Sequence, residues 1–336
     1  MCGCNTVAGI AHFAEVKNEW LNQLLGLNFR PVSYDTIWWF LVRVSPNALQ
    51  RFMLDWLKAL PVNLKNQVLA IDGKRLRGAS NNEHITHLVE LFATESRLMI
   101  AQEKVPDKKG ERKALPSLLK NFDVSGAIIS MDAHYTYKPE LKQIQDAGAD
   151  YIVGVKGNQG TLHAEVVNYF TQAHAIDYDS EEFECHTTLD KGHGRLETRK
   201  VCVSCDLEWL NGREKWGFEA LIEVRSQREI KGKKEKEIRY YASSRKATAK
   251  EFARWIRDHW QVENGLHYVL DVVFREDAAR ASAGYAAENL GLFRRMAMNV
   301  IKTFDPNRGF TDAIRNAAFE PAYLRGLLAR LFSDSC

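Results

Sequence analysis

Apolar side chains recur at helical spacing in the first part of the chain. Phe13, Val16, Trp20 and Leu24 form one such stripe, and a second stripe runs through residues 49–57. A period of about 3.6 residues places the members of each stripe on one face of a helix. Residues 1–66 are therefore predicted to form a small helical region.

The pattern changes after residue 66. Short continuous apolar runs predict buried strands, and apolar residues three or four positions apart predict helices. The predicted strands are residues 68–71, 87–93, 97–103, 127–131 and 151–155, and the predicted helices are residues 114–122, 139–147 and 159–173. Their order is that of the ribonuclease-H-like fold, a mixed α/β sheet flanked by helices.

Residues 176–244 are rich in strand patterns separated by glycine-rich or charged turns. A long helix is predicted over residues 249–273, and further helices over 285–304 and 311–332. We therefore predict four segments. They are a helical N-terminal region (1–66), the first part of a ribonuclease-H-like domain (67–175), a β-rich insertion (176–245), and a long helix with C-terminal helices (246–336).

Composition excludes some classes of protein. The formal net charge of +3 is too small to indicate nucleic-acid binding, so any basic surface must come from local clustering. No apolar run is long enough to span a membrane, and residues 1–18 lack the pattern of a secretory signal. Because Cys202 and Cys205 form a lone CxxC pair, we expect reduced thiols and a cytoplasmic protein, not a zinc site.

Two aspartates stand where apolar runs end. Asp72 follows the run at 68–71, and Asp132 follows the run at 127–131. Functional groups in open α/β sheets gather at such strand ends, and the two strands are neighbours in the ribonuclease-H-like arrangement. Two carboxylates held close together repel each other, and a divalent cation relieves that cost. For either aspartate alone, a turn-forming role is the simpler alternative.

A third acid lies on the predicted long helix. Glu263 falls on the shoulder of the apolar stripe of residues 249–273, on the side of Trp260 and His267. A carboxylate placed there is poorly solvated and needs a partner, and a metal ion is a good one. Carboxylates suit Mg²⁺, and a pair of such ions suits phosphodiester chemistry.

Four blocks of sequence resemble one family. The block AIDGKRLRG (70–78) resembles the DGK-x-x-RG segment of the H-repeat-associated insertion-sequence transposases. The blocks GADYIVGVKGNQ (148–159), GHGRLETR (192–199) and HWQVENGLHYVLDV (259–272) are similar to three further segments of that family. The similarity runs from about residue 10 to residue 330, and the blocks together are highly specific.

The resemblance implies a transposase of the DDE type with Asp72, Asp132 and Glu263 as metal-binding catalytic acids. It implies DNA strand cleavage and strand transfer with Mg²⁺, for which Mn²⁺ could substitute. The expected partners are double-stranded DNA, in the form of terminal inverted repeats and target DNA, and a second copy of the chain in the synapsed complex. The expected location is the bacterial cytoplasm, at the nucleoid.

A wider set of residues is expected to contact DNA, or in the case of His267 to orient a carboxylate. The set comprises Lys74, Arg75, Arg77, Lys156, Asn158, His193, Arg195 and His267. Each has a plain alternative: a solvated loop for the basic residues after Asp72, a hairpin turn for His193 and Arg195, and a packing histidine for His267.

Some positions depart from the wider transposase pattern. A Tyr, an Arg and a Lys commonly flank the glutamate there, and this chain has Ile256, His259 and Leu270 instead. The chain also begins inside the helical preamble of the family. Two alternatives therefore stay open: an inactive or truncated remnant that only binds DNA, and a nuclease of the same fold that cuts without strand transfer.

Overall fold

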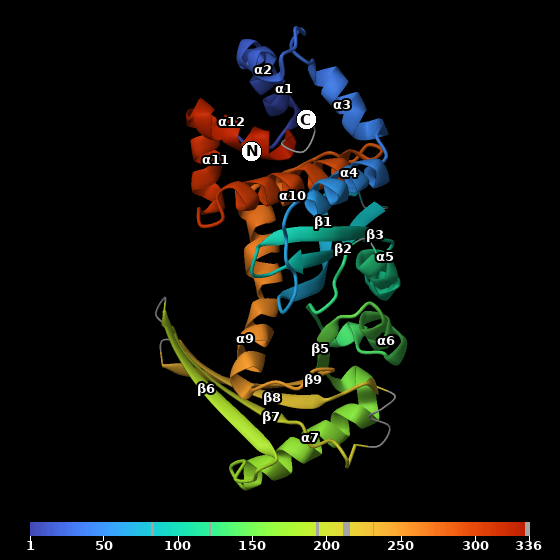
Figure 1. Ribbon diagram of the computed structural model, residues 1–336, viewed down its shortest axis with the longest axis vertical. Coiled ribbons are helices and arrows are strands. Elements are labelled where there is room, and N and C mark those ends of the chain that lie inside the picture. Colours follow the sequence, from blue (N-terminus) through green and yellow to red (C-terminus); the bar gives the residue numbers. More distant parts are fainter. Residues whose placement is uncertain (82–83, 121, 193–194, 211–215, 231, 333–336) are drawn as a thin grey trace. The chain divides into compact units, whose positions relative to one another are not determined.

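The computed structural model groups the chain into two compact units. The first comprises Met1–Asn63, Gly73–Phe122 and Val262–Cys336, and the second comprises Leu64–Asp72 and Asp123–Gln261. The structure describes residues 1–81, 84–120, 122–192, 195–210, 216–230 and 232–332, and the side chains of 77–81, 84–86 and 332 lie outside the description. Figure 1 traces the elements in sequence colours. Within this part of the chain, no helix is long and apolar enough to cross a bilayer.

The first unit contains most of the helices. They are α1 (Val7–Val16), α2 (Asn18–Leu25), α3 (Tyr34–Arg43), α4 (Pro46–Ala59), α5 (Leu115–Lys120), α10 (Ala286–Phe304), α11 (Phe310–Phe319) and α12 (Pro321–Phe332), with the 3₁₀ turns η1 (Lys108–Ala114) and η6 (Glu276–Ala278). The helices expected in residues 1–66 are thus found as α1 to α4. Val7 of α1 and Leu41 of α3 pack with Leu290 of α10 in a shared apolar cluster.

Two strands of the first unit pair with each other. β2 (His84–Ala93) and β3 (Leu98–Val105) are antiparallel, and β2 also neighbours β1 (Val68–Asn81). β1 is shared, because its residues up to Asp72 belong to the second unit. The expected end of this strand at residue 71 is wrong, since the extended backbone continues through Asp72 and Gly73 to Asn81.

The second unit is built on a sheet. Its elements are β4 (Ile128–Met131), η2 (Ala133–Tyr135), α6 (Lys138–Asp146), β5 (Asp150–Val155), η3 (Gly157–Gln159), α7 (Gly160–Ala175), β6 (Phe183–Gly192), β7 (Arg195–Ser204), β8 (Ala220–Ile230), β9 (Lys233–Ser243) and α9 (Ala249–His259). The strand order is β1-β4-β5-β9-β8-β7-β6. β1, β4 and β5 are parallel, and the others are antiparallel.

The β-rich segment at residues 176–245 extends the main sheet. β9 pairs antiparallel with β5, so the four added strands continue the sheet that β1, β4 and β5 begin. Together with β2 and β3, the strand order β3-β2-β1-β4-β5 and the helices that follow β4 and β5 confirm the predicted mixed α/β, ribonuclease-H-like fold class.

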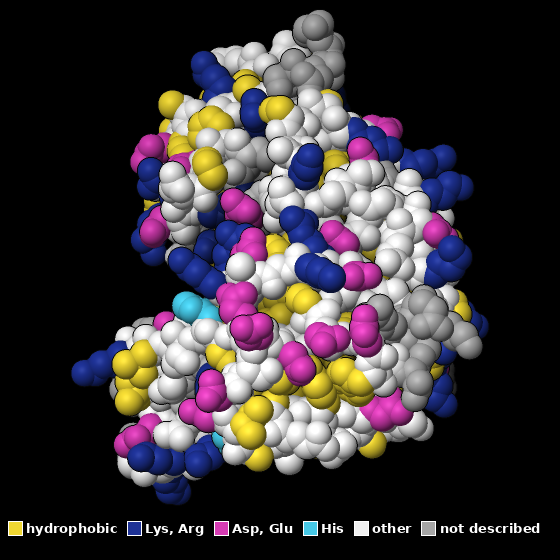
Figure 2. Space-filling model, turned by 60° about the horizontal axis from the view of Figure 1, so that its bottom comes forward, with side chains coloured by type: hydrophobic (Ala, Val, Ile, Leu, Met, Phe, Trp, Pro, Cys, Tyr) yellow, Lys and Arg dark blue, Asp and Glu magenta, His cyan; other side chains and the backbone are white. Residues whose placement is uncertain are grey.

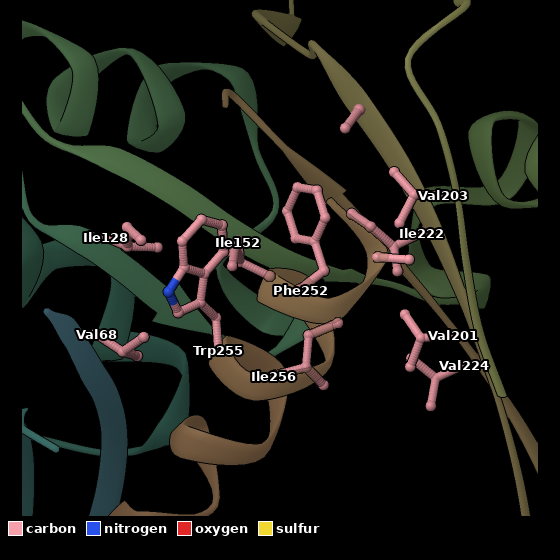
Figure 3. Close-up of a cluster of buried hydrophobic side chains, with 12 residues drawn as sticks. Val68, Ile128, Ile152, Val201, Val203, Ile222, Val224, Phe252, Trp255 and Ile256 are labelled. Atoms are coloured by element: carbon pink, nitrogen blue, oxygen red, sulfur yellow. The ribbon is translucent and has the colours of Figure 1, made fainter. Parts of the chain in front are cut away.

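α9 and α7 cover opposite faces of the extended sheet (Figure 1). Thr248 caps the N-terminus of α9 in a capping box with Glu251. Phe252 and Trp255 of α9 then pack on valines and isoleucines from five strands, Ile222 among them (Figure 3). On the other face, Phe170 of α7 contacts Tyr240 of β9. This apolar core fixes α9 against the sheet.

A disulfide joins β6 and β7, the last two strands at one edge of the sheet. Cys185 of β6 lies directly opposite Cys202 of β7, and their sulfur atoms are bonded. Cys205, the other half of the CxxC pair, is free. The expectation of reduced thiols throughout is therefore wrong for Cys185 and Cys202. The error arose because strand pairing, not sequence spacing, brings these two cysteines together.

Candidate active site

Asp72 and Asp132 lie at the same level of two neighbouring parallel strands. β1 and β4 pair in register from Val68↔Ile128 to Ala70↔Ser130, and each aspartate follows two residues after the last of these pairs. Asp132 keeps an extended backbone, with φ −74° and ψ 173°. Adjacent strands are about 4.8 Å apart, and residues at one level share a face. Continued for two residues beyond its last pair, the register would bring Asp72 and Asp132 to neighbouring positions on the two strands.

The shared face of the aspartates is the face that α9 covers. Val68 and Ile128 stand at even-numbered positions like the two aspartates, and both pack in the cluster under α9 (Figure 3). Ser130, two residues before Asp132, is hydrogen-bonded through its Oγ to Nδ1 of His259 on α9 at 2.9 Å. Side chains alternate between faces along a strand. The acid pair therefore lies on the α9 side of the sheet.

His259 lies beside this site. The sequence singled it out only because the wider transposase family commonly has an arginine at that position. Burial lowers the pKa of His259 to about 4, although the nearby Asp132 carboxylate acts in the opposite direction. The imidazole is therefore neutral at neutral pH, and its contact with Ser130 is a hydrogen bond between neutral groups. No feature of the local sequence around Ser130 identifies it as the partner.

Two residues of the sequence block 148–159 hold the loop that follows Asp132. Asp132 Oδ1 accepts a hydrogen bond from the backbone N–H of His134 at 2.8 Å and so caps η2. The side-chain amides of Asn158 and Gln159 both donate to the carbonyl of Ala133, each at 2.8 Å. Asn158 thus lies close to the aspartate, as expected, and its amide holds the backbone of the loop.

Gly154 of β5 lets this loop approach the sheet closely. A Cβ atom at Gly154 would lie 3.1 Å from the backbone nitrogen of Ala133, the residue after Asp132. Thr136 donates from its Oγ1 to the carbonyl of Gly154 at 2.7 Å. A larger residue at position 154 would therefore press on the Asp132 loop where it packs on β5.

Close packing also explains the glycine at position 73, in the first unit. A Cβ atom there would lie 2.2 Å from Oε1 of Glu111 and 2.8 Å from Nε2 of His87. These two side chains form a pair at 2.6 Å. An Asp-Gly pair suggests a turn, but Gly73 lies within the continuous strand β1. Its lack of a side chain leaves room for Glu111 and His87.

Glu263 is an exposed residue of the first unit, on the helical chain that continues α9. The predicted helix over 249–273 is present, but residues from Val262 onward are π-helical, in the segments η4 (Val262–His267) and η5 (Val269–Val273). Such wide turns are rare and are found frequently at functional sites. The sequence pattern did not distinguish them from an α-helix.

Two of the residues expected to contact DNA are engaged inside the first unit. Lys74 is buried, with Nζ 2.5 Å from Asp271 Oδ1 and 3.5 Å from Glu276 Oε2. His267 Nε2 lies 2.9 Å from Glu90 Oε2. Both side chains therefore have carboxylate partners within the protein.

The remaining expected DNA contacts are on the surface where they are described. Arg75 and Lys156 are exposed. Arg195 is also exposed, 3.7 Å from Glu197. The side chain of Arg77 and the whole of His193 lie outside the described residues. Lys and Arg side chains are interspersed with Asp and Glu on the face drawn in Figure 2, in line with the small net charge.

The two carboxylates, one within β1 and one directly after β4, are donors that fit a hard divalent cation. Asp72 and Asp132 offer carboxylate oxygens at one level, and Mg²⁺ is commonly held by one or two carboxylates with water and phosphate oxygens. Within the described residues, no three His, Cys, Asp or Glu side chains converge as a preformed metal site. The aspartate pair belongs to the second unit, and Glu263 to the first.

Comparisons with known proteins cover nearly the whole chain. Residues 63–300 match the model of the transposase DDE domain, and residues 1–57 match that of the region associated with it. YncI of Escherichia coli O157:H7, named as a candidate transposase, is 32% identical over 97% of this chain and 87% of its own length. YhhI of Escherichia coli K12, named as a candidate H repeat-associated transposase, is 33% identical over 95% of this chain and 86% of its own length.

Among solved structures, a piggyBac transposase in a synaptic complex with hairpin DNA aligns with 97% of this chain and 81% of that chain, with a TM-score of 0.45 and 12% identity. The match to the domain model spans well over half of the chain, and the curated relatives match along most of their length. The chain belongs to the DDE transposase family, with H repeat-associated relatives.

Proposed function

We propose that this chain catalyses Mg²⁺-dependent strand cleavage and strand transfer of insertion-sequence DNA, with Asp72, Asp132 and Glu263 as its catalytic acids. The observation that supports the proposal is the register of β1 and β4, in which Ala70 pairs with Ser130 and an aspartate follows two residues later on each strand. An isolated turn-forming aspartate has no reason to match a second one across a strand pair. The matched pair is what a metal-dependent phosphodiester reaction needs.

We assign metal binding to the three acids and positioning of the Asp132 loop to Asn158 and Gln159. Asp72, Asp132 and Glu263 supply oxygen ligands for Mg²⁺, for which Mn²⁺ can substitute. When bound, the metal lowers the pKa of an attacking water or 3′-hydroxyl and stabilises the leaving oxygen. Asn158 and Gln159 hold the backbone next to Asp132, so that the position of its carboxylate is set before DNA binds.

Exposed basic residues are the proposed phosphate contacts. Arg75 follows Asp72 closely on β1, and Lys156 ends the strand β5 that neighbours β4. Arg195 lies at the start of β7. Phosphate contacts position DNA without reading its sequence. Substituting any one of them is expected to weaken binding to all DNA sequences alike and to reduce its dependence on salt.

The partners we propose are the terminal inverted repeats of the element and a target DNA, with two copies of the chain acting when two ends are joined. We further propose that the protein acts at the bacterial nucleoid. A sizing measurement on the protein with and without end DNA checks the copy number. A complex holding two DNA ends and a single chain would contradict this part of the proposal.

Strand transfer is tested with precleaved DNA that ends in the inverted repeats flanking the gene, mixed with a supercoiled plasmid. The proposal predicts Mg²⁺-dependent plasmid molecules covalently joined to the ends. Cleavage of uncut end DNA without any joined product would support a nuclease of the same fold. Tight binding of end DNA with no cleavage in Mg²⁺ or Mn²⁺ would support a remnant that only binds.

A further inference from the structure

A network of buried charged side chains lies in the first unit, centred on Arg295. Arg295 on α10 is fully buried, and so is Glu90 on β2. The guanidinium of Arg295 donates from Nε to Glu90 and from Nη1 to Glu276 Oε1, the latter at 2.6 Å. One arginine thus bridges two carboxylates from distant parts of the chain.

The network continues on both sides of the arginine. Beyond Glu276 it reaches Lys74 on β1, whose Nζ also binds Asp271 of η5. Beyond Glu90 it reaches His267 of η4. Side chains from β1, β2, the π-helical segments and α10 therefore meet in one continuous set of polar contacts.

Glu90 and Arg295 are charged in the folded protein. Burial alone would raise the pKa of Glu90, but Arg295 and His267 together lower it to about 2. Burial acts to lower the pKa of Arg295, and the two carboxylates raise it above its ordinary value. A buried ion whose partner is removed is left without compensation, so each member fixes the position of the others.

The spacing of the network along the chain connects it with the proposed catalytic acids. Lys74 lies two residues after Asp72 on β1, on the same side of the strand. His267 and Asp271 lie four and eight residues after Glu263, about one and two helical turns on. Two successive turns of the segment that bears Glu263 are thus held by β2 and β1.

The segment so anchored is π-helical. A π-helix is rare compared with an α-helix and is found frequently at functional sites. Within the first unit, Arg295 reaches the segment through Glu90 and His267, and through Glu276, Lys74 and Asp271. The segment is thus held at two points, by the contact of His267 with Glu90 and by the contact of Asp271 with Lys74.

We propose that Arg295 and Lys74 are positioning residues that orient Glu263 for metal binding. This inference rests on the proposed function, and it gives Lys74 a role different from a direct phosphate contact. Residues that support metal ligands typically change metal affinity about ten- to a hundredfold when substituted.

The test measures Mn²⁺ binding to the full chain by calorimetry, without DNA, and amide hydrogen exchange in residues 262–273. Arg295→Met alone leaves two carboxylates uncompensated, so it is paired with Glu90→Gln to preserve folding. A matched control is Asn299→Ala, one turn further along α10, which removes hydrogen bonds to Met99 and touches no member of the network. Arg295→Lys is expected to retain part of the function.

The double variant is expected to bind Mn²⁺ about tenfold more weakly than wild type and to exchange faster at residues 262–273, whereas Asn299→Ala matches wild type in both. In a Glu263→Gln background, the same double substitution is expected to cause no further loss of affinity, because its effect passes through Glu263.

A folded double variant with wild-type affinity and exchange would overturn the inference, and so would an equal loss of affinity in the Glu263→Gln background. Failure of the wild-type protein to join DNA would count against the proposed function alone, because neither measurement here uses DNA.

Discussion

His259 Nδ1 on α9 lies 2.9 Å from Ser130 Oγ on β4, two residues before Asp132. This hydrogen bond and the apolar cluster around Trp255 fasten α9 to the strand that carries one of the proposed catalytic acids. The same helix continues toward Glu263 along the chain. Contacts within the second unit thus hold α9, and the buried charges hold the segment around Glu263 within the first unit.

Stability is predicted to depend on pH through His259. The pKa of His259 is about 4 in the folded protein and close to 6.5 in the unfolded chain. As pH falls from 6.5 to 4, His259 takes up a proton in the unfolded chain but stays largely neutral in the folded protein. The free energy of unfolding therefore decreases. The loss amounts to at most about 3 kcal/mol, since one pKa unit corresponds to about 1.4 kcal/mol.

Urea unfolding at pH 7 and pH 4.5, followed by tryptophan fluorescence, checks this dependence. His259→Asn keeps a hydrogen-bonding group and removes the titration, so the variant is expected to lose less stability than wild type over the same interval. An identical loss in both proteins would show that His259 is not the group responsible.

Gly154→Ala is predicted to impair cleavage more than folding. The added methyl group would press on the backbone of Ala133 and displace the Asp132 loop by a few tenths of an ångström. Small displacements of reacting groups cost about ten- to a hundredfold in rate, and we expect a loss of that order in Mg²⁺-dependent cleavage.

Gly157→Ala is the matched control for this substitution, because nothing lies within 4 Å of its added Cβ atom. It lies in the same sequence block and is expected to cleave at close to the wild-type rate. Equal rates for the two alanine variants would refute the role assigned to the contact between β5 and the Asp132 loop.

Reduction of the Cys185–Cys202 disulfide is predicted to destabilise the β6–β7 hairpin. The bond closes a loop with a sequence separation of 17, and loops of this size contribute about 3 kcal/mol through the unfolded state. The urea midpoint of wild type should fall on addition of reductant, and Cys185→Ser should show no further fall. Cys205→Ser serves as the control that retains the bond. A wild-type midpoint insensitive to reductant would contradict the prediction.

That Asp72 and Asp132 follow buried apolar runs on neighbouring strands could be predicted, because such runs leave a local signal in the sequence. An apolar run followed by a polar residue marks the end of a buried segment, and the order of the elements indicated which strands are neighbours. The continuation of β1 past Gly73 could not be predicted. Turn preference at an Asp-Gly pair is local, whereas pairing with β2 and packing on Glu111 are tertiary effects that override it.

Local sequence patterns could not predict the π-helical turns or the network of buried charged side chains. Over a short segment, the apolar residues Leu266, Val269 and Leu270 fit either helical period. Lys74 was expected at a solvated or DNA-binding surface, yet its nearest carboxylate is 197 residues further along the chain. A sequence reveals that a charge is present, but only the fold determines whether its partner is water, DNA or another side chain.

The central claim is that Asp72, Asp132 and Glu263 act together in catalysis, and cleavage of end DNA by single variants tests it most directly. Asp72→Asn, Asp132→Asn and Glu263→Gln keep the shape of each side chain and remove one charge. Each is expected to abolish Mg²⁺-dependent cleavage and strand transfer while DNA affinity and thermal stability stay close to wild type. Cleavage at the wild-type rate by any one of the three would contradict the assignment of that residue.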